Sequence, residues 1–310
     1  MMAMAAPPRT PRFMPPGRPP ARTPDLAPAR APARSTAGPW LDTPVRRLRE
    51  GQVHEQIDRL AVEAPLEIRF GDQPFTVLMR TPGNDEELVA GFLYSEGLVQ
   101  GAEEIRSLAH PEALLDDDCQ NVVAVELAPP AGGLQAPAAQ AIAGRTFYAS
   151  ASCGVCGKTS IADLAVTAPA VVSALRIDRA LLETLPDRLR VMQPVFAETG
   201  GLHGAALFDA NGALLAARED IGRHNAVDKL IGWALRRGLL PLSDAVLVVS
   251  GRLGFEIVQK AIVAGIPLVA AVGAASSIAV GLAERYGLTV ATFVKPGNIN
   301  LYGKVERLCG

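Results

Sequence analysis

Two cysteines, Cys153 and Cys156, are separated by two residues in the stretch ASCGVCGK, which holds two glycines and ends at Lys158. This spacing has three common uses: half of a zinc site, a pair that exchanges disulfides, and a cysteine that carries a sulfur atom. Zinc requires two further ligands. The chain has no second pair of this kind, and His203 and His224 are distant in sequence. We therefore expect no structural metal.

Disulfide exchange and sulfur carriage both stay open for this pair. An exchange pair of the thioredoxin type belongs to a strand-helix-strand unit. Here the preceding stretch RTFYAS is short, and the loop holds two glycines. Sulfur carriage needs a nucleophilic thiolate that moves between a donor and an acceptor; the glycines would allow that movement, and Lys158 would favour the thiolate. Cys119 and Cys309 stand alone, and we expect no chemistry from them.

A second concentration of reactive side chains lies in EDIGRHNAVDK, residues 219–229. His224 can change its charge near neutral pH, and Arg223 can bind a phosphate or a carboxylate through its forked guanidinium group. The alternative is a solvated helix face with a cap from Asn225 or a neighbouring group. We expect five residues of this stretch to support the site: Arg223, His224, Asn225, Asp228 and Lys229.

His203 raises the question of zinc-dependent deamination. Nucleobase deaminases carry the signature H-x-E followed by P-C-x-x-C. In HGA, residues 203–205, alanine stands where the glutamate is required, and no cysteine pair follows. Hydrolytic deamination is therefore disfavoured.

The alternation of elements in the second half of the chain predicts an α/β fold with parallel strands. AVLVVS, IPLVAAV and TVATFV are typical of strands, and FEIVQKAIVAG and SSIAVGLAERYG are typical of the helices between them. Right-handed crossovers place such strands side by side. Upstream, GAALFDANGALLAA predicts a hairpin that turns at Asn211-Gly212, and the apolar spacing after it predicts a helix that ends near Gly238.

Three of the predicted strands end in polar loops: residues 250–253, 273–277 and 293–298. In open α/β sheets, ligands bind beyond the carboxyl ends of the strands. Glycine allows a close approach of the backbone, and a helix N-terminus attracts anions. Arg252 and Lys295 can add charged hydrogen bonds. The sequence therefore predicts a crevice for a ligand that carries phosphate.

The first half of the chain predicts a smaller α+β unit. PLEIRF and PFTVLM flank GDQ as a hairpin, and NVVAVEL is typical of a strand. NDEELVAGFLYSEGLV predicts a helix that Asn84 caps, with acidic residues in its first turn. We assign a small α+β domain to residues 41–150, a mobile loop with the cysteine pair to 151–165, and a larger α/β domain to 166–310.

The first forty residues have a different composition, with eleven of the 25 prolines and six arginines against one acidic residue. Such a stretch buries too little apolar surface to order itself, so we expect a disordered tail. Because the whole chain carries a net charge of −2, the remaining residues carry −7, which argues against a nucleic-acid-binding protein.

We expect the protein to be cytoplasmic, without a membrane partner. The tail lacks the continuous apolar segment of a secretory signal. Residues 261–283 have no charge and are long enough to cross a bilayer, but Gly265, Pro267 and Gly273 divide them into the end of a helix, a strand and the start of another helix.

Four stretches resemble, in this order, the formate dehydrogenase accessory sulfurtransferase family, FdhD: ASCGVCGK, EDIGRHNAVDKLIG, SGRLGFEIVQKA and ASSIAVGLAERYGLTV. The resemblance covers about residues 50 to 310 and excludes the tail. It implies two domains, the larger similar to cytidine deaminase in its three-layer α/β fold, without deaminase chemistry. It also implies a homodimer.

The resemblance implies an enzyme, a sulfurtransferase that acts as a sulfur carrier. Such a protein takes sulfane sulfur from a cysteine desulfurase as a cysteine persulfide. It transfers the sulfur to the molybdenum of bis(molybdopterin guanine dinucleotide), which it binds as its client's cofactor, and so activates formate dehydrogenase. The client dehydrogenase and the choice between molybdenum and tungsten stay open.

The family's site residues carry over by their motifs. Cys153 matches the cysteine that bears the persulfide, and Cys156 matches its partner. The stretch FVKPGN matches the cofactor-binding segment and comprises Phe293, Val294, Lys295, Pro296, Gly297 and Asn298. The crevice described above adds Arg252 and Ser276. The family's segment is richer in arginine, so Lys295 and Asn298 are departures, and lysine lacks the arginine fork.

Two other classes of function remain alternatives. A thiol-disulfide oxidoreductase would cycle Cys153 and Cys156 with a dithiol and ignore guanine nucleotides. A non-catalytic chaperone of the molybdenum cofactor would bind the cofactor and need neither thiol.

Overall fold

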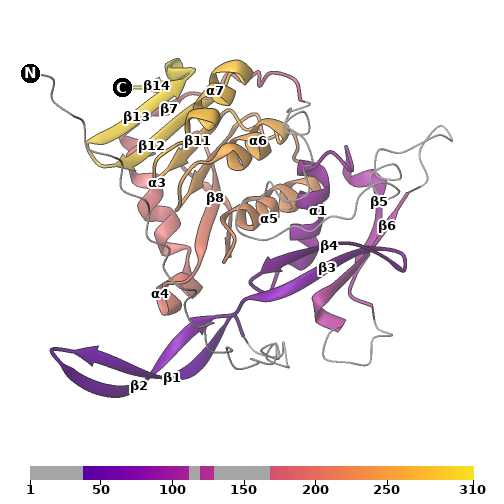
Figure 1. Cartoon of the computed structure of the whole chain (residues 1–310). Coiled ribbons are helices and arrows are strands. Elements are labelled where there is room, and N and C mark those ends of the chain that lie inside the picture. The colour runs from indigo at the N-terminus through magenta and orange to yellow at the C-terminus, as the bar shows by residue number, and fades with distance from the viewer. Residues whose placement is uncertain (1–37, 112–118, 129–167) are drawn as a thin grey trace, which may run out of the picture. The chain divides into compact units, whose positions relative to one another are not determined.

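The computed structural model describes residues 38–111, 119–128 and 168–310 (Figure 1), and these described residues belong to one compact unit. The boundaries predicted near residues 150 and 165 lie outside the described residues, and so does the tail. Strands β1 (Trp40–Arg49), β2 (Gln52–Ala61), β3 (Ala64–Phe70) and β4 (Gln73–Arg80) come first, followed by helix α1 (Asp85–Ser95) and strands β5 (Ile105–Ala109) and β6 (Val122–Leu127).

The larger sheet has six strands in the order β13-β12-β11-β10-β8-β9 (Figure 1). Its strands are β8 (His203–Asp209), β9 (Leu214–Asp220), β10 (Ala245–Val249), β11 (Leu268–Ala271), β12 (Thr289–Lys295) and β13 (Asn298–Gly303). β10, β11 and β12 are parallel, as the sequence predicts, while β8, β9 and β13 run antiparallel to their neighbours. The predicted hairpin turn is confirmed: Gly212 has φ +77°, the left-handed region in which glycine is favoured.

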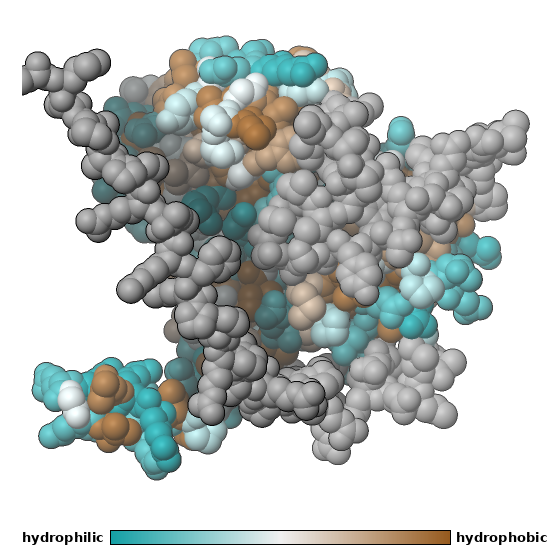
Figure 2. Space-filling model, viewed as in Figure 1, coloured by the Kyte–Doolittle hydropathy of each residue, from teal (hydrophilic) through white to brown (hydrophobic). Residues whose placement is uncertain are grey.

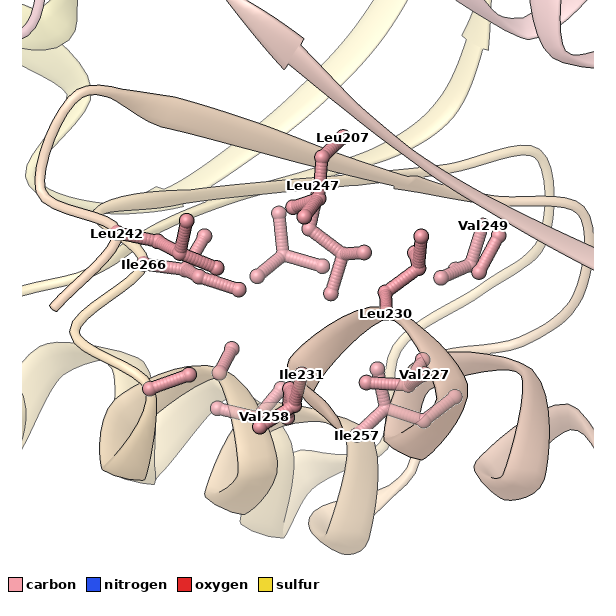
Figure 3. Packing of buried hydrophobic residues seen from close by; sticks show 14 of the residues in the cluster. Leu207, Val227, Leu230, Ile231, Leu242, Leu247, Val249, Ile257, Val258 and Ile266 are labelled. Atoms are coloured by element: carbon pink, nitrogen blue, oxygen red, sulfur yellow. The ribbon is translucent and has the colours of Figure 1, made fainter. Parts of the chain in front are cut away.

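Helices cover both faces of this sheet, so the fold is α/β. Alternate residues of each strand point to opposite faces. Leu247 and Val249 of β10 pack against α5 (Arg223–Leu235), α6 (Phe255–Val263) and α7 (Ser277–Tyr286), while Val246 and Val248 pack against α3 (Arg179–Val191). Figure 3 shows the first of these layers, with Leu230 and Ile257 facing the strands. Burial on both faces explains the continuous apolar runs of these strands.

The smaller sheet has the order β4-β3-β6-β5, and the predicted hairpin of β3 and β4 is confirmed. Leu88, Val89 and Leu93 of α1 are buried against it with Leu66 and Ile68. The predicted cap of α1 is wrong in one respect: Asn84 is the residue before the helix, but its side chain caps nothing. Asn84 adopts a left-handed backbone (φ 57°, ψ 34°), which Asn tolerates better than most residues, whereas a capping residue has extended backbone.

Helix α1 lies directly against helix α5, backbone to backbone. A Cβ added at Gly91 of α1 would lie 1.8 Å from the carbonyl oxygen of Asp228, and one added at Gly232 of α5 would lie 1.8 Å from that of Glu87. Only glycine permits this approach. A side-chain hydrogen bond also joins the two helices, from the hydroxyl of Ser95 of α1 to the carboxylate of Asp228 of α5, and Arg218 of β9 donates two hydrogen bonds to the carboxylate of Glu87 of α1.

Strands β1 and β2 form a separate two-stranded hairpin, which the sequence analysis did not predict. It turns at Glu50 and Gly51, both with positive φ. Apolar side chains are exposed along it, including Leu48 (69% exposed) and Ile57. Figure 2 shows them as brown patches among hydrophilic residues, on the hairpin at the lower left.

The remaining described α-helix is α4 (Pro194–Thr199), and the remaining strands are the short parallel pair β7 (Ile177–Asp178) and β14 (Leu308–Cys309). Short 3₁₀ helices lie at Ala102–Glu104, Cys119–Asn121 and Val305–Arg307. The apolar segment 261–283 is divided as predicted, into the end of α6, strand β11 and the start of α7. Among the described helices, none combines the length and the apolar character that crossing a bilayer requires.

Candidate functional site

The structure brings the three predicted loops together at the carboxyl ends of β10, β11 and β12. The N–H of Gly273 donates to the carbonyl of Gly251 (3.1 Å), and the N–H of Phe293 donates to the carbonyl of Gly273 (3.3 Å). A Cβ at Gly273 would lie 2.9 Å from the oxygen of Gly251 and 3.1 Å from Cα of Arg252, so this position requires glycine. We call these adjoining loops the strand-end surface.

The predicted cofactor-binding segment 293–298 comprises the end of β12, a turn at Pro296 and Gly297, and the first residue of β13. Phe293 has a left-handed backbone (φ 51°) within an irregular stretch of β12, and its side chain is 45% exposed. The amide of Asn298 donates to the carbonyl of Phe293 (2.9 Å). The N–H of Gly297 donates to Glu183 of α3 (2.8 Å). That hydrogen bond, followed by one from Arg179, lowers the pKa of Glu183.

A depression of about 510 Å³ adjoins this turn. Its lining consists of Val272, Phe293, Val294, Lys295, Asn298 and Asn300. An exposed phenyl ring next to amide side chains and one lysine is a surface on which a planar heterocycle could stack and form hydrogen bonds. Pro296 and Gly297 are exposed in the turn. Ser276 lies at the neighbouring loop, where its hydroxyl caps α7 by accepting from the N–H of Ala279.

At the other end of the strand-end surface, three basic side chains gather around Gly251. A Cβ added at Gly251 would lie 3.4 Å from Nδ1 of His203 and 3.8 Å from Cδ of Arg223. Arg252 is the next residue along the loop, and it is exposed. Within the described part of the chain, neither Arg223 nor Arg252 forms a hydrogen bond or an ion pair, and Nε of Arg223 is buried without an acceptor.

His203 lies in a positive environment. Burial lowers its pKa below the usual value, the charges of Arg223, His224 and Arg252 lower it further, and Asp220 opposes the change. The imidazole is therefore neutral at physiological pH and can donate or accept a hydrogen bond.

The other predicted supporting residues have partners that hold the fold. Nε2 of His224 lies beside the carboxylate of Glu256 of α6. Lys229 pairs with the fully buried Asp220 (2.8 Å), which also accepts from the N–H of Thr81 and from Asn225. These contacts bind the start of α5 to the segment that precedes α1.

Asp228 forms a second buried group with neighbouring helices. Its carboxylate accepts from the hydroxyl of Ser95 (2.9 Å) and pairs with Lys260 of α6 (2.9 Å). Asn225 likewise donates to the carbonyl of Met79 (2.8 Å). Of the five predicted supporting residues, Arg223 alone faces the strand-end surface without a partner among the described residues.

Sequence reasoning did not assign His203 to the site. It tested that histidine only against a deaminase signature, which His203 fails. The available signal was its position: β8 pairs antiparallel with β10, so the first residue of β8 lies beside the last residues of β10, where the N–H of Gly204 donates to Oγ of Ser250.

The cysteine pair lies outside the described residues, so the roles of Cys153 and Cys156 stay predictions. Cys309 is exposed and reduced. Within residues 38–111, 119–128 and 168–310, no three metal-ligating side chains come together.

Comparison with known proteins gives one consistent result. Residues 61–309 match the model of the FdhD/NarQ family. A protein of Mycobacterium tuberculosis named sulfur carrier protein FdhD is 47% identical over 276 residues, which span 85% of this chain and 96% of that protein. The protein of the same name from Anaeromyxobacter dehalogenans is 43% identical, over 81% of this chain and 88% of that protein.

A solved structure agrees with the sequence matches. The crystal structure of a protein from Desulfotalea psychrophila, described as a formate dehydrogenase accessory protein, superposes with a TM-score of 0.68 at 25% identity. The superposition covers 88% of this chain and 100% of that one.

Proposed function

The chain belongs to the FdhD/NarQ family, and on that basis we propose that it is a sulfur carrier in the maturation of formate dehydrogenase. The observation that carries the proposal is the family match over residues 61–309, which includes both the cysteine pair and the strand-end surface. The name of its relatives, sulfur carrier protein FdhD, supports the same role.

Sulfur would enter on Cys153. The thiolate of Cys153 attacks the outer sulfur of a persulfide on a cysteine desulfurase. The donor's sulfur-sulfur bond breaks, a new one forms on Cys153, and the donor leaves as a thiolate. No net oxidation occurs in this step, because sulfane sulfur passes from one thiolate to another.

Sulfur would leave with the help of Cys156. Conversion of sulfane sulfur to sulfide needs two electrons, which the thiolate of Cys156 supplies when it attacks the inner sulfur of the persulfide. A disulfide forms between Cys153 and Cys156, and hydrosulfide is released for the molybdenum of the client cofactor. A cellular dithiol then reduces the disulfide and completes the cycle.

The strand-end surface would hold bis(molybdopterin guanine dinucleotide) as a substrate. The fit is chemical: arginines without a partner at one end suit the cofactor's phosphates, and the depression beside Phe293 suits a purine base. Because Gly251 and Gly273 have no side chains, a ligand can approach the backbone of these two loops closely. The proposal includes a homodimer and a cytidine-deaminase-like larger domain.

Persulfide loading tests the sulfur-carrier role. After incubation with a cysteine desulfurase and cysteine, the intact protein should gain the mass of one sulfur atom, and a reductant should remove it. Cys153→Ala should gain nothing, and the matched control Cys309→Ala, which removes an exposed thiol, should load normally.

The alternatives give different results in the same experiment. A chaperone would gain no sulfur, and its Cys153→Ala variant would activate the client as well as wild type does. A disulfide oxidoreductase would form an internal disulfide and retain no additional sulfur. A wild-type protein that gains no sulfur would contradict the proposal.

A further inference from the structure

At the end of the strand-end surface around Gly251, the positive charges of Arg223 and Arg252 have no acidic partner among the described residues. Arg223 is partly buried, and its Nε is fully covered without an acceptor. An arginine keeps its charge under all physiological conditions, and a covered charge without a partner is costly. Nearby Asp220 does not compensate it, because Lys229, Asn225 and two backbone N–H groups already occupy that carboxylate.

The arrangement around Gly251 leaves room for an anion. No side chain rises from residue 251 or 273, while His203, Arg223 and Arg252 flank that part of the backbone. Helix α5 begins at Arg223, and its N-cap residue Gly222 provides no side-chain cap, so Arg223 lies at the positive end of the helix dipole. His224, on the same helix, is turned to Glu256 instead.

We propose that His203, Arg223 and Arg252 form a subsite for one phosphate group of the ligand, beyond the carboxyl end of β10. The inference rests on the proposed function for the identity of the ligand, but the subsite itself requires only an anion with several acceptor oxygens. Arg223 supplies a forked donor, Arg252 supplies a second, and His203 supplies a hydrogen bond.

The subsite fixes the direction in which a nucleotide lies. The phosphate lies at the β10 end, and the chain of contacts from Gly251 through Gly273 to Phe293 leads to the depression of about 510 Å³. The base therefore lies beside Phe293 and Asn298. Loss of a positive charge at the β10 end should lower the affinity for every ligand that carries phosphate. It should leave the affinity for a nucleoside, which has no phosphate, unchanged.

Calorimetric titration of inorganic pyrophosphate and of GDP into the full-length protein tests the subsite. Arg223→Ala should lower the affinity for both ligands roughly tenfold or more. Arg223→Lys, which keeps the charge, should lower the affinity less than Arg223→Ala does. Because the Arg223 side chain forms no hydrogen bond among the described residues, its removal should leave the melting temperature nearly unchanged. The control is Arg285→Ala, an equal change of charge on an exposed residue in the last turn of α7, away from the strand ends.

The outcomes separate this inference from the sulfur-carrier role. Equal affinity of wild type and Arg223→Ala, or no pyrophosphate binding by wild type, overturns the subsite even if Cys153 loads sulfur. An equal loss in Arg285→Ala also overturns it, since only net charge would then matter. Pyrophosphate binding that depends on Arg223, in a protein that gains no sulfur, supports the subsite and rejects the proposed function.

Discussion

At the scale of single residues, His203, Arg223 and Arg252 gather around Gly251, beyond the end of β10. Cys153 and Cys156 attract attention by spacing alone, and Arg223 and Arg252 by type. Nothing in residue type or spacing separates Arg223 from its charged neighbours on α5. Only the fold shows that Asp228 and Lys229 are occupied by buried ion pairs while Arg223 faces an open surface. His203 was missed because strand pairing, and not a motif, places it there.

The lowered pKa of His203 predicts a dependence of stability on pH. The unfolded state protonates this histidine at its usual pKa, about 6.5, and the folded state protonates it only at lower pH. As the pH falls below about 6.5 the unfolded state binds more protons, so the free energy of unfolding decreases, and the decrease ends below the folded-state pKa. The contribution is absent at higher pH, where both states are neutral.

His203→Asn isolates this effect from that of other groups. Denaturant unfolding of wild type and variant from pH 8 to pH 5 should show a smaller loss of stability at acid pH in the variant. Sulfate, which keeps its charge over this range, should reduce the loss in wild type by favouring the protonated imidazole. The same pH dependence in both proteins would refute the assignment.

At the scale of elements, periodicity and turn residues predicted most of the larger sheet and its order of helices. AVLVVS, IPLVAAV and TVATFV are strands because both of their faces are buried. The hairpin of β1 and β2 was missed because most of it is exposed, so its sequence lacks a clean alternation of apolar and polar residues. Helix α3 was missed as well, although Asp178 caps it by accepting from the N–H of Leu181.

The contact of α1 with α5 predicts an asymmetry between two glycine substitutions. Gly232→Ala should lower the free energy of unfolding by on the order of 2–3 kcal/mol, because its Cβ would overlap the carbonyl of Glu87. Gly281→Ala, in helix α7 with no atom within 4 Å of the added Cβ, should be neutral or stabilise by up to about 1 kcal/mol. Urea unfolding of both variants measures the difference. Similar stabilities would show that the two helices lie further apart.

At the scale of the whole molecule, the smaller sheet supports the strand-end surface. Met79 and Thr81, which lead from β4 towards α1, bind Asn225 and Asp220 beside the start of α5. The side chain of Arg223 is thus positioned by residues from both halves of the chain. Sequence patterns predicted the elements of each half of the chain but not the hydrogen bonds that join the two halves. Such bonds link residues about 140 positions apart, so they leave no local pattern in the sequence.

Removal of residues 1–33 should leave sulfur loading and pyrophosphate affinity unchanged. The first described strand begins at Trp40, and the composition of residues 1–33, rich in proline and arginine, provides no apolar core to join. The comparison requires equal melting temperatures of both proteins. A loss of sulfur transfer from the desulfurase after truncation, with the melting temperature preserved, would show that the tail binds a partner.

The transfer of labelled sulfur to a client tests the central claim most directly. Protein loaded with radiolabelled sulfur and freed of the desulfurase is mixed with inactive formate dehydrogenase that contains its molybdenum cofactor. Label should move to the dehydrogenase, and activity should appear in proportion to the label transferred. Loaded Cys309→Ala should behave as wild type. Activation by Cys153→Ala, or activity that appears while the label stays on the carrier, would contradict the account.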